Sequence, residues 1–247
     1  MVALLRLVRA EFKLFAREPI GLFFSLAFPV LLLLLFGSIY GNEPADIFGG
    51  LGTIDVSVPA YTAMIIGTTG LMSLPITVAG YREKGVLRRY RVTPVAPVTI
   101  LVAQGAVMLA MTILGMALLI LVGVVLYGLT FHGRAGGFAL GFLLSCLGFY
   151  ALGFLLGALL PTARSTQIVA MAIFYPMLFL SGAGMPRELL PPGIRRFSEV
   201  LPLTHVVTLL RGLWVGDPWG SHLKEVAVLG ALVVVGTLLA ARLFRWE

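Results

Sequence analysis

The sequence predicts an all-α integral membrane protein with six transmembrane helices. Of its 247 residues, 59% are hydrophobic and only 12% are charged, and the mean hydropathy is +1.02. Soluble domains carry about 25% charged residues, so the composition excludes an ordinary soluble protein. Apolar runs close to the roughly 20 residues that a helix needs to cross a bilayer recur along the chain. They cover residues 20–40, 58–80, 98–127, 136–160, 167–182 and 226–243, which together predict one transmembrane domain over residues 1–247.

Residues 1–19 precede the first span and separate apolar from cationic side chains at helical spacing. Leu4, Val8, Phe12 and Phe15 share one face, and the cations lie opposite. This pattern is typical of a helix lying in the membrane interface and differs from a cleaved signal peptide. The alternative is a charged leader that only sets topology. The positions that define the expected interface helix are Arg6, Arg9, Phe12, Lys13 and Arg17.

Residues 81–97, YREKGVLRRYRVTPVAP, form the long polar interruption in the first half of the chain. On a helical wheel, Val86, Leu87 and Tyr90 share one arc, and cations face away from it. Thr93-Pro94 then ends the helix, because a residue before proline disfavours the α conformation. The segment predicts a short, basic, amphipathic helix between spans two and three, typical of a membrane subunit that a soluble partner grips. The alternative is a topology signal alone.

Residues 185–220 are too apolar for a free loop and, being rich in proline, too broken for a span. Leu203–Val215 offers a helix of about 13 residues, too short to cross a bilayer alone. We expect short helices that dip into the outer leaflet and return; the alternative is a loop lying on the membrane surface. An arginine inside a membrane is costly. Arg211 is therefore expected near lipid headgroups or paired with Glu199 or Asp217.

Most Lys and Arg residues fall in the N-terminal helix, residues 81–97, the turn at 161–166 and the C-terminal tail. By the positive-inside rule, these segments and both termini are expected in the cytoplasm. The net charge of +7 then reflects contact with anionic membrane lipids and a cytosolic partner, and we expect no nucleic acid partner. The single cysteine, Cys146, lies in an apolar run and allows no internal disulfide.

Motifs for nucleotide or metal chemistry are missing from the sequence. It contains no GxxxxGK[ST] phosphate loop, no HExxH and no CxxC. The six apolar runs hold no Asp, Glu, Lys or Arg except Arg242, next to the last residue of the sixth, whereas ion-coupled transporters need such groups inside the membrane. If this protein moves a solute uphill, the energy must therefore enter from outside the bilayer, and residues 81–97 are the expected place.

Two segments, REKGVLRRYRVTPV and SGAGMPRELLPPGIRRFSEVLPLTHVVTLLRG, carry a resemblance to a known family. With the amphipathic N-terminal helix, they resemble the permease subunits of ABC exporters of the second type, those related to daunorubicin-, nodulation-factor- and polysaccharide-export permeases. The family pattern E-x-G-x-L-x-R matches Glu83, Gly85, Leu87 and Arg89, followed by Thr93 and Pro94. The outer elements P-L-T-H and L-R-G match residues 202–205 and 210–212.

The resemblance implies six spans, a dimer with a second permease copy or a paralogue, and two ABC ATPase subunits on the cytoplasmic face. It further implies that residues 81–97 form the coupling helix on the ATPase. The expected coupling residues are Arg82, Glu83, Lys84, Gly85, Leu87, Arg88, Arg89, Arg91 and Pro94. In the outer segment, the expected functional residues are Pro202, Thr204, His205 and Arg211.

The expected function is that of a permease in a prokaryotic cytoplasmic membrane, exporting a hydrophobic or amphipathic substrate such as a drug, lipid or lipid-linked glycan. ATP and Mg²⁺ would bind the partner ATPase; this chain is expected to bind no cofactor or metal and to have no catalytic residue. One alternative is a membrane-embedded transferase acting on lipid-linked substrates, which would need convergent His, Asp or Glu side chains near one membrane face. Another is a non-catalytic membrane scaffold.

Overall fold

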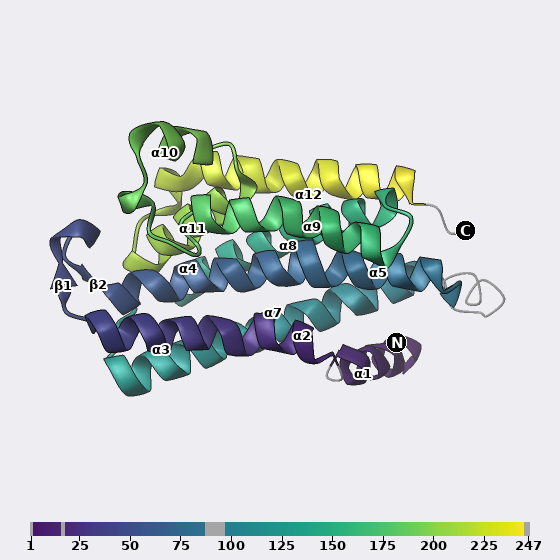
Figure 1. Ribbon diagram of the computed structural model, residues 1–247, viewed down its shortest axis with the longest axis horizontal. Helices are drawn as coiled ribbons and strands as arrows, with labels where there is room; N and C mark the ends of the chain where they lie inside the picture. Colours follow the sequence, from purple (N-terminus) through teal and green to yellow (C-terminus); the bar gives the residue numbers. More distant parts are fainter. Residues whose placement is uncertain (1, 16–17, 87–96, 245–247) are drawn as a thin grey trace.

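The computed structural model describes residues 2–15, 18–86 and 97–244, and most of them are helical (Figure 1). Within that part of the chain, six helical stretches are long and apolar enough to cross a membrane, which confirms the predicted six-span, all-α class. Their bounds are Phe23–Tyr40, Thr53–Glu83, Thr99–Tyr127, Ala135–Leu159, Ala163–Leu180 and Trp219–Leu243.

The first two spans each contain a π-helical segment just before a proline. Span one consists of η1 (Phe23–Ala27) and α3 (Phe28–Tyr40), and α2 (Pro19–Leu22) leads into it. Span two consists of α4 (Thr53–Gly67), η3 (Thr68–Ser73) and α5 (Leu74–Glu83). Pro29 and Pro75 lack an N–H and crowd the carbonyl four residues earlier. Those carbonyls lie inside η1 and η3, so the wider π turns accommodate both prolines.

The widened segment η3 also carries a buried chain of hydroxyl groups. The Thr69 and Thr112 hydroxyl oxygens are 2.9 Å apart, and the Tyr150 hydroxyl lies 2.8 Å from that of Thr112. The three side chains come from η3, α7 (Pro97–Tyr127) and α8 (Ala135–Leu159). Because each polar atom has a partner, the hydroxyls are tolerated in an apolar interior, and they join three helices at one level.

The second span begins earlier than expected. The sequence predicted a start at residue 58, but α4 starts at Thr53 after a short antiparallel pair, β1 (Pro44–Ala45) and β2 (Leu51–Gly52), which flanks the 3₁₀ turn η2 (Asp46–Phe48). The Asn42 side-chain oxygen accepts hydrogen bonds from the N–H groups of Ile54 and Asp55 at 3.0 and 3.2 Å. A residue outside the helix thus satisfies its open first turn.

Asp55 consequently lies inside a helix rather than in a loop, and only 7% of its surface is exposed. Its Oδ1 accepts hydrogen bonds from the Thr130 N–H at 3.0 Å and the Thr130 hydroxyl at 3.2 Å. The predicted core of span two, residues 58–80, holds no charge, but the helix itself does. This carboxylate joins the start of α4 to the connection after α7.

The remaining helices follow the chain in order. α1 (Val2–Phe15) contacts α7, and α9 (Ala163–Leu180) begins at a capping box formed by Thr162 and Ser165. The predicted outer segment contains η4 (Arg187–Leu189), α10 (Pro192–Ser198), α11 (Pro202–Val215) and η5 (Trp219–His222). α12 (Leu223–Leu243) closes the bundle and lies along α8. α11 is deeply packed against α4, α8 and α12, so it is part of the bundle.

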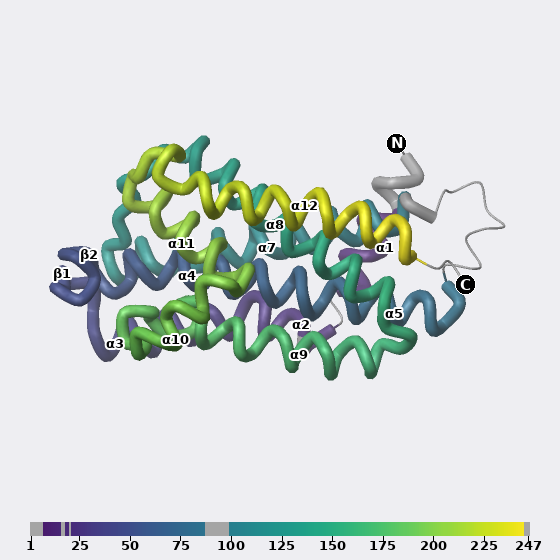
Figure 2. Tube along the Cα trace, turned by 90° about the horizontal axis from the view of Figure 1, so that it is seen from above, coloured from purple at the N-terminus to yellow at the C-terminus, as the bar shows by residue number. Residues whose placement is uncertain are grey.

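The bundle has two distinct ends (Figures 1 and 2). One end, called here the α5 end, holds α1, the last turn of α5, the turn between α8 and α9, and the C-terminal turn of α12. The opposite end, called here the α11 end, holds the β1–β2 pair, α10 and α11. The expected cytoplasmic and outer segments therefore lie at opposite ends of one bundle.

Two glycines allow α8 to lie directly on span two. A Cβ at Gly153 would overlap the Gly70 carbonyl oxygen, and one at Gly157 would lie 3.2 Å from the Pro75 carbonyl oxygen. These neighbours are backbone atoms and cannot rotate away. The spacing of four residues is the small-xxx-small arrangement that brings helix backbones close in membranes.

We expect Gly153→Ala to destabilise the protein by about 2 kcal/mol, because an added atom in a tight backbone contact must be relieved by moving a helix. Thermal unfolding in detergent measures the effect. Gly230→Ala in α12 is the matched control, since a Cβ there meets no atom within 4 Å. Equal melting temperatures for the two variants would contradict the close α8–η3 contact.

Candidate functional site

Arg82 and Glu83 bind the turn between α8 and α9. One Arg82 nitrogen, Nη1, donates to the Ala158 carbonyl at 2.9 Å, and Nη2 donates to the Leu160 carbonyl. The Ala163 N–H donates to Glu83 Oε2 at 2.8 Å. A cation thus meets the carbonyl end of α8, and an anion meets the N–H end of α9, which matches the sign of each helix dipole. The two side chains fix the end of α5 to this turn.

Gly85 ends α5 through its backbone conformation. Its φ is +65°, in the left-handed region, and its N–H donates to the Arg82 carbonyl at 2.9 Å. This is the usual role of glycine just after a helix. A Cβ at this position would meet nothing within 4 Å, so crowding within this chain does not explain the glycine. Sequence analysis named Gly85 only as an expected coupling residue and missed this local requirement.

The rest of the expected coupling segment lies largely outside the described residues. Residues 81–83 form the last turn of α5, and Lys84 follows with an exposed side chain. The prediction of an amphipathic helix therefore stays a prediction for the following positions, which fall in the gap between residues 86 and 97: Leu87, Arg88, Arg89, Arg91 and Pro94.

Glu11 connects α1 to both helices that flank the 84–96 connection. Its surface is 8% exposed, and its Oε2 accepts a hydrogen bond from the Tyr81 hydroxyl at 2.5 Å and another from the Gln104 side-chain N–H. Tyr81 belongs to the last turns of α5, and Gln104 to the second turn of α7. Burial raises the pKa of the Glu11 carboxyl, while the two hydrogen bonds oppose that rise. One carboxyl group thus holds α1 at the base of two spans.

Sequence analysis gave Glu11 no role. The available signals were an acidic residue among cations and a lone glutamine in an apolar helix. Of the expected interface positions, Arg9 and Lys13 are exposed and Phe12 is 42% exposed. The side chains of Arg6 and Arg17 lie outside the described part of the structure.

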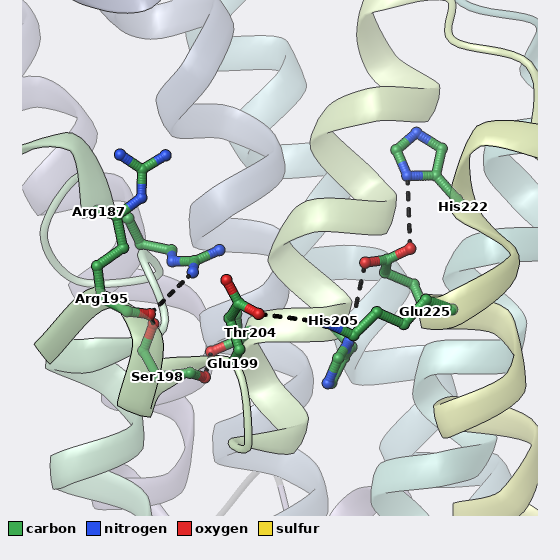
Figure 3. Close-up of polar contacts among 9 residues, drawn as sticks. Arg187, Arg195, Ser198, Glu199, Thr204, His205, His222 and Glu225 are labelled. Atoms are coloured by element: carbon green, nitrogen blue, oxygen red, sulfur yellow. Dashed lines mark hydrogen bonds and ion pairs between the residues drawn. The ribbon is translucent and has the colours of Figure 1, made fainter. Parts of the chain in front are cut away.

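At the α11 end, Glu225 lies between His205 and His222 (Figure 3). Glu225 Oε1 is 3.9 Å from His205 Nδ1, and Oε2 is 3.8 Å from His222 Nδ1. Burial lowers the pKa of His205, which the nearby Glu225 charge partly offsets. His205 is therefore neutral near pH 7. The cluster places the first turn of α11 against η5 and α12.

The other expected outer residues have structural partners in the same region. Pro202 lies in the first turn of α11, and the Thr204 hydroxyl donates to the Ser198 carbonyl at 2.5 Å. Arg211 pairs with Glu188, Nη1 to Oε1 at 2.5 Å. The predicted pairing with Glu199 or Asp217 is therefore wrong. Glu188 lies 23 residues earlier in the chain, a separation that local patterns do not reveal.

Across residues 2–15, 18–86 and 97–244, no group of three or more His, Cys, Asp or Glu side chains is arranged to hold a metal ion. The site residues instead fix helix ends to one another at both ends of an apolar six-span bundle. Such an architecture is that of a multi-pass membrane protein.

Residues 2–214 match the family described as ABC-2 type transporter, and the chain belongs to that family. The resemblance inferred from residues 83–94 and 202–212 is confirmed at this level. The family's description is that of a transporter, and two of the relatives below are named as transport permeases.

Three relatives show the range of similarity. Nodulation protein J of Rhizobium leguminosarum bv. viciae is 33% identical over 99 residues, covering 40% of this chain and 38% of the relative. Inner membrane transport permease YhhJ of Escherichia coli K12 is 26% identical over 200 residues, covering 77% and 50%. Putative transport permease ycf38 of Porphyra purpurea is 24% identical over 244 residues, covering 96% and 82%. The chain spans half or less of the length of the first two.

We expect Glu11→Ala to loosen α1, because a buried hydrogen-bond donor left without its acceptor costs about 1–3 kcal/mol. Spin labels at Lys13 and Arg164, which are both exposed, report this as a broader distance distribution in electron spin resonance. Glu11→Gln retains an acceptor oxygen and should keep the narrow distribution, as should Glu18→Ala at an exposed position. An unchanged distribution in Glu11→Ala would show that Glu11 does not hold α1.

Proposed function

We propose that this chain is the membrane-spanning subunit of an ATP-driven exporter, with ABC ATPase subunits bound at the α5 end. The observation that carries the proposal is the set of bonds made by Glu11, Arg82 and Glu83. They connect the start of the 84–96 connection to α1, α7 and the α8–α9 turn. A partner that moves the 84–96 connection would therefore move spans two to five together. A coupling element has to transmit motion in this way.

Charge supports the same orientation. Among the described residues, Lys and Arg gather at the α5 end, in α1, Arg82, Lys84, Arg164 and Arg242, whereas cations and carboxylates are nearly balanced at the α11 end. We infer from this distribution that the α5 end and both termini face the cytoplasm. ATP and Mg²⁺ then bind the partner subunits, and a second permease copy or a paralogue completes the complex.

The cargo in this proposal is a hydrophobic or amphipathic molecule leaving the cytoplasm or inner leaflet. The apolar character of the spans supports it, since the predicted spans at residues 20–40, 58–80, 98–127, 136–160, 167–182 and 226–243 hold no Asp, Glu, Lys or Arg except Arg242, next to the last residue of the sixth. Such a lining offers no binding group for a driving ion. The transferase alternative is separated by activity: turnover of a lipid-linked substrate by the purified chain without an ATPase would support it instead.

We expect Lys84→Glu to weaken association with the cognate ABC ATPase about tenfold, because charge reversal at a contact replaces attraction by repulsion. Titration of the detergent-purified permease with the ATPase measures the affinity, and stimulated ATP hydrolysis in proteoliposomes measures coupling.

Arg196→Glu is the matched control, since this exposed arginine belongs to α10 at the opposite end. It should bind and stimulate the ATPase as the unchanged protein does. If Arg196→Glu lost affinity for the ATPase while Lys84→Glu kept it, the ATPase would bind at the α11 end, and the proposal would be wrong.

A further inference from the structure

A cavity of about 800 Å³ opens at the α11 end. Its lining comes from α3, the β1–β2 region, the first turns of α4, residues 182–189 and α11. Sites for small molecules are commonly concave, largely apolar spaces of about 300–1,000 Å³ with a few polar groups. This cavity has the size of such a site.

Part of the lining is suited to a hydrocarbon chain. Aromatic and aliphatic side chains from three helices contribute to it, including Phe36, Phe48, Tyr61, Met185 and Val207. Burying a hydrocarbon chain against these groups removes apolar surface from water, which is favourable. An extended apolar ligand is therefore accommodated.

Another part of the lining carries charge. It contains three arginines, two carboxylates and one histidine: Arg187, Arg195, Arg211, Glu188, Asp217 and His222. Two of these groups are already paired with carboxylates. Arg211 binds Glu188 at 2.5 Å, and His222 Nε2 lies 3.3 Å from Asp217 Oδ2.

Arg187 has no such partner. Among the described residues, no carboxylate oxygen lies within 4.0 Å of its guanidinium, and its one hydrogen bond runs from Nη2 to the Arg195 carbonyl at 3.3 Å. Its Nε is buried without a partner in that part of the chain, as is Glu188 Oε2. Burial lowers the pKa of Arg187, so the pocket by itself disfavours this charge. A bound anion would remove that penalty.

We propose that this cavity binds an amphiphile with a phosphate headgroup. The phosphate accepts hydrogen bonds from the Arg187 guanidinium, with Arg195 adding positive charge, because the planar guanidinium suits phosphate oxygens. A hydroxyl or ammonium group beside the phosphate donates to Glu188 Oε2. The chain lies against the aromatic and aliphatic lining. The ligand is either the exported cargo or a resident membrane lipid, and its assignment as cargo rests on the proposed function.

Binding is tested with detergent-purified protein titrated with phosphatidylglycerol and followed by native mass spectrometry. Arg187→Gln should weaken binding about tenfold, because it removes a charge-assisted hydrogen bond. Arg196→Gln, an exposed arginine outside the cavity, should bind within about twofold of the unchanged protein. Diacylglycerol, which has the same chains and no phosphate, should bind more weakly and should not respond to Arg187→Gln.

A second pair of variants tests the cavity without altering charge. Thr208→Trp fills a lining position, whereas Ile194→Trp places the same side chain at an exposed position of α10. Only Thr208→Trp should prevent phosphatidylglycerol binding. Equal binding to both tryptophan variants, or to both arginine variants, would overturn the proposal. If millimolar inorganic phosphate displaced bound phosphatidylglycerol as effectively as added phosphatidylglycerol does, the cavity would be a site for free phosphate. That result would also overturn the proposal.

The source of the ligand is resolved in the complete complex with its ATPase. Release of bound spin-labelled phosphatidylglycerol during ATP turnover would show that the site lies on the cargo path. Retention would show that the ligand is a resident lipid. Both results are consistent with a lipid-binding site in this cavity. Lipid binding is measured without ATP, so a protein that fails to transport can still bind the lipid. Conversely, stimulation of the ATPase tests the proposed function even if the lipid does not bind.

Discussion

The structure depends on one constraint: in an apolar surrounding, every backbone N–H and C=O needs a partner within the protein. Helices satisfy it along their length, so the critical places are helix ends and prolines. Asn42 supplies acceptors for the first turn of α4, while Arg82 and Glu83 supply the missing partners at the turn between α8 and α9. These capping side chains also connect one helix to another. The same hydrogen bonds therefore satisfy backbone groups at helix ends and hold the bundle together.

The class of the protein was predictable because span length and apolar composition are local properties. All six spans were expected from runs of apolar residues, and α11 was expected from a helical stretch between prolines. Family membership was predictable from short motifs, because residues 83–94 and 202–212 can be recognised in the sequence without knowing their contacts.

Partners across long separations were not predictable. Glu11 binds a tyrosine 70 residues away and a glutamine 93 residues away, and Glu83 caps a helix 80 residues later. No local pattern encodes such pairs. The error at Asp55 has the same origin, because the acceptor that allows α4 to begin at Thr53 is a side chain in the preceding turn. Sequence reasoning identified the segments that matter and missed the bonds that connect them.

The π segment η3 has a consequence for the orientation of span two. A π turn holds one residue more than an α turn, and each residue of an α-helix rotates the chain by about 100°. The register of α5 is therefore set independently of the register of α4. Asp55 at one end and Tyr81, Arg82 and Glu83 at the other can each face their own partners. Removing a single residue from η3 would rotate α5 relative to α4 by about 100° around the helix axis. Chain length within these six residues is thus as constrained as their chemistry, and we expect related chains to tolerate substitutions there more readily than insertions or deletions.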